Sequence, residues 1–119
     1  ALALMSWLSS TVHIAVAGLF RPGRFAEDVA VHEPIKATAR VNLENCYAEI
    51  DKMLTGKTFA MGGQYTVCDP YLLVFYRWGN RIGIPMKDRY PVWAKHAQRV
   101  ASRPTVKRVF EAEGIQLEG

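Results

Sequence analysis

The longest apolar run in the chain lies directly behind a helix-start signal. Residues 71–78 are almost entirely apolar or aromatic, with Arg77 as the exception. The run is too short to span a membrane, which takes ~20 apolar residues. A helix that is apolar nearly all round is typically buried on every side. The pattern therefore predicts a buried central helix over residues 66–81.

The start of this helix carries a capping signal. Thr66 precedes Asp69 by three residues. In a capping box, the hydroxyl accepts from the amide of the third helical residue, and the acidic side chain accepts from the amide of the capping residue. A negative charge there also suits the positive end of the helix dipole. Thr66 and Asp69 are therefore predicted to form a structural capping box.

Helical periodicity extends over most of the chain, and strand-like alternation is scarce. Pro22 and Gly23 are predicted to end the first helix. The predicted helices cover, in order, residues 2–20, 33–54, 66–81, 91–102 and a short segment from residue 104. Together they predict an all-α fold, a bundle of about five helices around a buried central helix, as one domain over residues 1–119.

Composition narrows the class of protein. The chain has 119 residues, 50% hydrophobic and 22% charged, as in an ordinary soluble domain. The net charge of +4 is scattered without charge runs, so no nucleic-acid partner is expected. Cys46 and Cys68 form neither a disulfide framework nor a metal-type pair, which predicts structural thiols, no metal and a cytoplasmic protein.

The first residues carry no evident signal peptide, and no membrane partner is expected. The chain opens with "ALALMSW", already helical in character and without an initiator Met. We expect a fragment whose upstream part is missing.

The first helix offers the main candidate chemistry. Its polar positions share one face at helical spacing, and apolar positions continue that face. Such a face is typical of a wall for an amphiphilic ligand, although a partly exposed His beside Ser is the simpler interpretation. Trp78 is likewise either a core aromatic or a ligand contact. The candidate substrate-binding residues are Ser6, Ser10, His13, Val16, Phe20 and Trp78.

Three features of the sequence occur together. The first is the box at Thr66 and Asp69, followed by the Arg77–Trp78 pair in "GGQYTVCDPYLLVFYRWGNRIGI". The second is the ending "RPTV…AEG", and the third is "STVHIAVAGLF" in the first helix. Together they resemble the C-terminal helical domain of cytosolic glutathione transferases, most closely the bacterial beta class, and they cover nearly the whole chain in that family's order.

The resemblance implies a missing N-terminal thioredoxin-like domain, which would bind the co-substrate glutathione and supply the main catalytic residue. That residue is a cysteine in the beta class, and neither Cys46 nor Cys68 aligns with it. His13 matches the family's His that faces glutathione and would assist catalysis. Ser6 matches an Asn that reaches the glutathione of the partner subunit in a homodimer. Val16, Phe20 and Trp78 match hydrophobic-substrate positions.

Some positions depart from the family pattern. Ile14 replaces a Lys, Ser6 is shorter than the Asn, and Val16 replaces an aromatic residue. Pro70 removes one helical hydrogen bond. These changes bear on the substrate profile and on glutathione binding, and they leave the fold unaffected.

The resemblance implies a parent enzyme, a glutathione S-transferase active in detoxification. It would conjugate glutathione to small hydrophobic electrophiles or exchange thiols and disulfides. The fragment alone is expected to be inactive, and to expose an apolar strip along its first and central helices where the missing domain docks. The alternative is a non-catalytic protein-interaction module of the same domain type.

Overall fold

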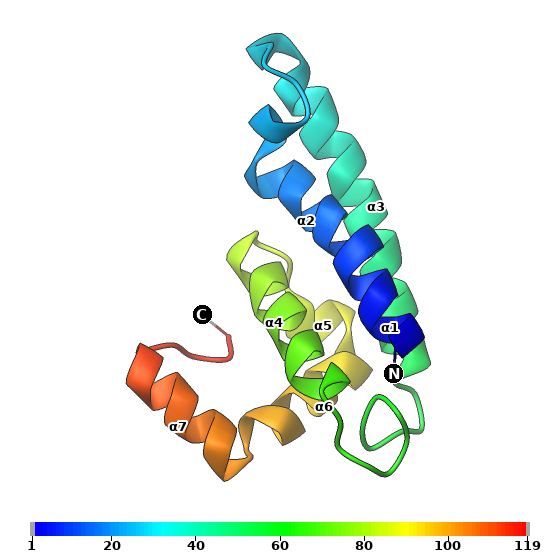
Figure 1. Cartoon of the computed structure of the whole chain (residues 1–119), viewed down its shortest axis with the longest axis vertical. Helices are drawn as coiled ribbons and strands as arrows, with labels where there is room; N and C mark the ends of the chain where they lie inside the picture. Colours follow the sequence, from blue (N-terminus) through cyan, green and yellow to red (C-terminus); the bar gives the residue numbers. More distant parts are fainter. Residues whose placement is uncertain (1, 119) are drawn as a thin grey trace. The chain divides into compact units, whose positions relative to one another are not determined.

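The computed structural model describes residues 2–118, and the chain divides into two compact units, residues 1–49 and 50–119. Every regular element of the described residues is helical (Figure 1). Phe59 and Gly62 form an isolated bridge, and no strand occurs among residues 2–118. The predicted all-α fold is confirmed.

The first predicted helix is present over its full length but contains a π-helical segment. Helix α1 (Leu2–Trp7), the π segment η1 (Leu8–Val12) and helix α2 (His13–Phe20) follow one another without a break. At the end of η1, the amide of His13 donates to the carbonyl oxygen of Leu8, five residues back. The hydroxyls of Ser9 and Ser10 donate to the carbonyl oxygen of Ser6 at 3.2 and 2.6 Å. The sequence pattern did not predict this segment.

After α2, the chain passes through two short turns into a long helix. Short turns η2 (Pro22–Arg24) and η3 (Val29–Val31) connect α2 to α3 (His32–Met53). The side chain of Asp28 starts η3, because its Oδ1 accepts from the amide of Ala30 at 3.0 Å. Within this unit, α2 and the first part of α3 lie side by side (Figure 1). The predicted second helix is thus confirmed to within a residue at each end.

The second unit contains the remaining predicted helices and a short additional one. These are α4 (Cys68–Arg81), α5 (Met86–Arg89), α6 (Pro91–Ala101) and α7 (Pro104–Glu113), of which α5 was not predicted. Helix α4 packs against α5 and α6. Most of its apolar positions are buried, while Val74 keeps 39% of its surface exposed. The buried residues of α4 are Cys68, Asp69, Leu72, Leu73, Phe75, Tyr76 and Gly79.

The residues after α7 fold back onto α4. The Tyr76 hydroxyl donates to Glu118 Oε1 at 3.2 Å, and Arg77 Nε donates to the carbonyl oxygen of Gln116 at 2.9 Å. Asn80 Nδ2 donates to the carbonyl oxygen of Leu117 at 3.3 Å. A charged side chain on a largely buried helix needs a polar partner. The returning segment supplies it for Arg77.

The capping box forms at the start of α4, with one bond shifted. The amide of Thr66 donates to Asp69 Oδ2 at 2.8 Å, as predicted. The Thr66 hydroxyl accepts from the amide of Cys68 at 3.3 Å, while the amide of Asp69 donates to the Thr66 carbonyl oxygen at 3.1 Å. The predicted bond to the Asp69 carboxylate is therefore confirmed. The Thr66 hydroxyl accepts from the amide of Cys68 rather than from that of Asp69.

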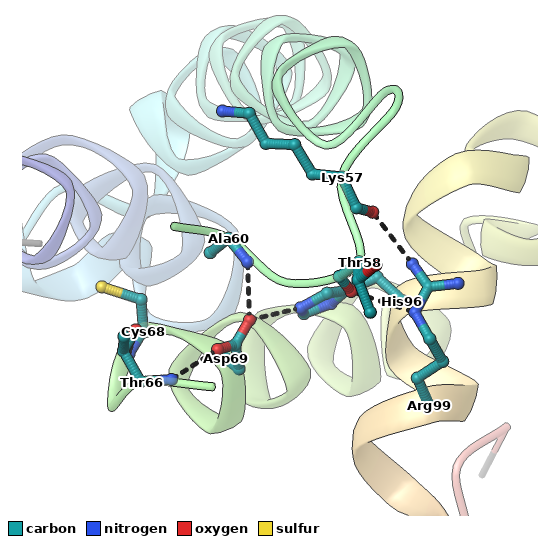
Figure 2. A network of polar contacts seen from close by, with 8 residues as sticks. All are labelled: Lys57, Thr58, Ala60, Thr66, Cys68, Asp69, His96 and Arg99. Atoms are coloured by element: carbon teal, nitrogen blue, oxygen red, sulfur yellow. Dashed lines mark hydrogen bonds and ion pairs between the residues drawn. The ribbon is translucent and has the colours of Figure 1, made fainter. Parts of the chain in front are cut away.

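The Asp69 carboxylate also holds two groups from other parts of the second unit. Its Oδ1 accepts from the amide of Ala60 at 2.8 Å and bonds His96 Nε2 at 2.7 Å (Figure 2). The side chains of Asp69 and His96 are both 0% exposed. One carboxylate thus connects the loop of residues 54–67, the start of α4 and the inner side of α6.

We predict that Asp69→Ala lowers the free energy of unfolding by ~3 kcal/mol or more, because it leaves several buried donors without an acceptor. Chemical denaturation followed by tryptophan fluorescence measures this. Asp28→Ala is the matched control, because it removes an exposed cap that makes a single bond, and its denaturation midpoint should move much less. Equal shifts in the two variants would contradict the central position of Asp69.

Candidate functional site

His13 lies exposed at the start of α2 and is not packed in the core. Phe20 follows seven residues later in the same helix and is 46% exposed. Seven residues are close to two turns, so the two side chains lie on one side of α2. Val16, between them, is 3% exposed. On α2, the open part of the predicted ligand wall therefore consists of His13 and Phe20, with Val16 within the packed interior.

The π segment separates Ser6 from this side. Ser6 and His13 are seven residues apart, which in an uninterrupted α-helix would place them on the same face. The π segment between them holds an extra residue per turn, and one extra residue turns a helix by ~100°. The prediction that Ser6 and His13 share one face is therefore wrong, although both side chains are exposed.

A groove of about 830 Å³ lies within the first unit, between α2 and α3. None of the residues lining it is charged, which is unusual on the surface of a chain with 22% charged residues. Ser10 lines this groove, whereas His13, Val16 and Phe20 do not. The lining includes Ile14, Gly18, Phe25, Ile35, Ala39 and Cys46. The structure thus separates Ser10 from the side of α2 that carries His13.

Both cysteines are buried, and neither forms a disulfide within residues 2–118. Burial raises the pKa of the Cys46 thiol above its ordinary value, and the charge of Glu49 raises this pKa further. A raised pKa leaves little thiolate at neutral pH, so the Cys46 thiol is a poor nucleophile. This agrees with the structural role predicted for it.

Trp78 belongs to the second unit. It is half-buried on α4, and its ring meets the Phe75 ring edge-on at 5.2 Å. Phe75 in turn packs against Tyr71 at 5.1 Å. The three rings form a row along α4, and Trp78 is its last member. Trp78 is therefore a packed aromatic residue that keeps part of its surface accessible.

His96 is the titratable residue that the sequence analysis missed. It lies three residues after Trp93 and one before Ala97, both buried on the inner side of α6. This spacing was a readable signal that His96 also faces inward. Its partner, Asp69, is 27 residues away and could not be read from the pattern. No group of three or more His, Cys, Asp or Glu side chains within residues 2–118 is arranged to hold a metal ion.

The family profile described as "Glutathione S-transferase, C-terminal domain" matches residues 9–104. The chain belongs to this family. The profile starts within η1 and ends at the first residue of α7, so it covers most of both units of the transferase domain.

Similar proteins are bacterial glutathione transferases. Glutathione S-transferase GstA of Escherichia coli O157:H7 is 26% identical over 112 residues, which are 94% of this chain and 52% of that protein. A sphingomonad glutathione S-transferase, solved in complex with glutathione, is 34% identical with a TM-score of 0.80, over 97% of this chain and 53% of its own. A Sulfitobacter homologue has the same fold, with a TM-score of 0.83 at 24% identity, over 96% of this chain and 54% of its own.

This transferase domain spans about half the length of the curated relatives that it matches. By length and composition its first helix, Leu2–Phe20, could cross a membrane, with a mean hydropathy of 1.5 and 33% of the apolar window buried. Core helices and signal sequences pass the same test. The structural match to the sphingomonad enzyme covers 97% of the chain, so most of this helix is part of the shared fold.

Helices α2 and α3 approach each other closely at Gly18 and Ala39, which line the groove. A Cβ added at Gly18 would lie 2.7 Å from the Cβ of Ala39, closer than two methyl groups can approach. We expect Gly18→Ala to lower the free energy of unfolding by ~1 kcal/mol or more. Overpacking costs ~1–3 kcal/mol, and the better helix propensity of Ala offsets only part of it.

Denaturation midpoints measure the effect. Gly63→Ala is the control, since nothing lies within 4 Å of a Cβ there. Adding Ala39→Gly to Gly18→Ala should recover most of the loss, because it removes the opposing methyl group. A stabilised Gly18→Ala variant would show that the two helices do not approach this closely.

Proposed function

We propose that this chain is the substrate-binding helical half of a cytoplasmic, homodimeric glutathione S-transferase. An N-terminal thioredoxin-like domain, outside this chain, would bind glutathione and supply the main catalytic residue. The observation that supports the proposal is the family match over residues 9–104, in a chain that corresponds to about half of each similar transferase. The glutathione bound to the sphingomonad relative supports the choice of co-substrate.

In the proposed reaction, the sulfur of glutathione attacks an electrophilic carbon, and the leaving group departs with its bonding electron pair. In the alternative reaction, the glutathione thiol exchanges with a disulfide. Both need the thiol in its deprotonated form and a hydrogen-bonding group that holds it in place. The helical half would contribute positioning and an apolar surface, and the chain alone would have little or no activity.

His13 is assigned the positioning role. Its imidazole is exposed on the side of α2 that also carries Phe20, so it is accessible to a ligand. Imidazole can donate and accept hydrogen bonds near neutral pH, which suits contact with a peptide or a thiol. We assign the hydrophobic co-substrate to Phe20 and Trp78, with Val16 as packing behind the wall. The hydroxyls of Ser6 and Ser10 are assigned to polar parts of the ligands.

The full-length gene product tests the function. Purified protein should conjugate glutathione to 1-chloro-2,4-dinitrobenzene or reduce a glutathione mixed disulfide, and the 119-residue chain alone should do neither. If the full-length protein neither catalyses these reactions nor binds glutathione, the non-catalytic interaction module is the correct interpretation.

We predict that His13→Ala in the full-length protein lowers turnover with glutathione ~10²-fold, because it removes a group that acts in the transition state. Thermal stability should stay nearly unchanged, since the side chain is exposed. His32→Ala is the contrasting variant in the same unit. His32 Nε2 bonds the carbonyl oxygen of Ala26 at 2.8 Å, so this change should lower the melting temperature with little effect on turnover per folded molecule.

Turnover and melting temperature are measured on the same preparations. The positioning role requires His13→Ala to change turnover and His32→Ala to change stability. If His13→Ala lowers the melting temperature and leaves turnover per folded molecule intact, His13 is only structural.

A further inference from the structure

A buried imidazole–carboxylate pair lies at the centre of the second unit, and its consequences do not depend on transferase activity. His96 Nε2 is 2.7 Å from Asp69 Oδ1, and both side chains are 0% exposed. The same oxygen accepts from the amide of Ala60, and the other carboxylate oxygen accepts from the amide of Thr66 (Figure 2). The Asp69 carboxylate therefore holds both ends of residues 60–66 to the start of α4, and His96 bonds the same carboxylate.

The geometry fits a neutral imidazole. In the neutral form, the N–H at Nε2 donates to the Asp69 carboxylate, and Nδ1 carries only a lone pair. His96 Nδ1 is buried and meets no hydrogen-bond acceptor or donor among residues 2–118. Protonation would place a second N–H at this position, where the described residues offer it no acceptor. An unsatisfied buried donor that carries charge is strongly unfavourable.

Electrostatics act in the same direction. Burial lowers the pKa of His96 below its ordinary value, and this outweighs the opposing effect of the Asp69 carboxylate on that pKa. Arg99, one turn further along α6, also lowers the pKa of His96 by repulsion. The charged groups that act on the imidazole are thus Asp69 at the start of α4 and Arg99 on α6.

The loop of residues 54–67 has a second attachment, which does not depend on His96. Arg99 Nε donates to the carbonyl oxygen of Thr58 at 3.0 Å, and Arg99 Nη2 donates to that of Lys57 at 3.3 Å (Figure 2). A guanidinium stays protonated at every pH used for proteins. Acid can therefore loosen the loop at Ala60 and Thr66 while Lys57 and Thr58 remain held.

We propose that the His96–Asp69 pair is an acid-sensitive latch, in which proton uptake by His96 releases residues 60–66 from Asp69 at the start of α4. The latch consists of His96, Asp69 and the amides of Ala60 and Thr66.

Proton linkage gives the direction in which pH changes the stability of the latch. The closed latch holds His96 neutral, while an opened latch exposes an imidazole with an ordinary pKa of ~6.5. Above that pH both states carry the same number of protons, so the stability of the latch is fully present. As the pH falls below ~6.5 the open state binds one more proton, and the opening equilibrium constant rises up to ~10-fold per pH unit.

Hydrogen exchange of single amides, measured by NMR on the purified protein between pH 8 and pH 5, tests the proposal. Rates are converted to protection factors to remove the pH dependence of the chemistry itself. We expect the protection factors of Ala60 and Thr66 to fall up to ~10-fold per pH unit below ~6.5. The amide of Tyr90, bonded to the Met86 carbonyl oxygen at 2.8 Å in α5, should change little.

His96→Gln is the matched variant, because its Nε2 can donate to Asp69 but does not titrate. It should make the protection of Ala60 and Thr66 independent of pH over this range. His32→Gln, in the other unit, should keep the wild-type profile. The latch is wrong if His96→Gln and the wild type show the same pH dependence.

A second measurement needs no variant. The ¹⁵N chemical shifts of the His96 ring should show a neutral imidazole protonated at Nε2 at pH 7, and a pKa below that of an exposed histidine. A doubly protonated His96 at pH 7 with the loop intact would show a stable buried ion pair and would overturn the proposal, even if His96→Gln does not fold.

Discussion

The fold of the second unit depends on one buried carboxylate. A charged group without solvent is tolerated only when hydrogen-bond donors surround it, and Asp69 finds them in Ala60, Thr66 and His96. Two of these donors come from the loop before α4 and the third from the inner side of α6, while the carboxylate itself lies in the first turn of α4. Each of these segments must therefore be in place for the others to be stable. Burying two ionisable side chains in the core carries a desolvation cost. Their positions are specified by directional bonds rather than by apolar contact alone.

How many of the partners of Asp69 could be predicted from the sequence depended on how far they lie from it along the chain. Thr66 and Asp69 are three residues apart, so the box was predictable from local geometry. Ala60 and His96 lie 9 and 27 residues from Asp69. The bond to Ala60 depends on the path of the loop, and the bond to His96 depends on the packing of α6 against α4, neither of which a local pattern encodes. The apolar periodicity located the long helices. The four residues of α5 are too few to show a period.

The candidate site divides in the same way. His13 and Phe20 belong to one regular helix, so their shared side followed from the spacing of seven residues. Ser6 lies beyond the π segment, and a hydrophobic pattern with a period of 3.6 residues does not reveal one extra residue in a turn. Ser10 lines the uncharged groove instead. The resemblance to the transferases identified the residue types, while the side on which each residue lies required the structure.

The π segment has a consequence for how this helix compares with its counterparts in other proteins. The π segment has the same effect as one residue inserted into an α-helix, which the helix accommodates by a wider turn and without forming a loop. The side-chain directions around the helix axis are therefore shifted between the residues before η1 and those after it. An ungapped alignment of residues 2–20 with a regular helix can match side chains that face the same way on one side of η1 only. Placing a single gap within Leu8–Val12 restores the correspondence on both sides, so His13 and Phe20 have to be matched independently of Ser6.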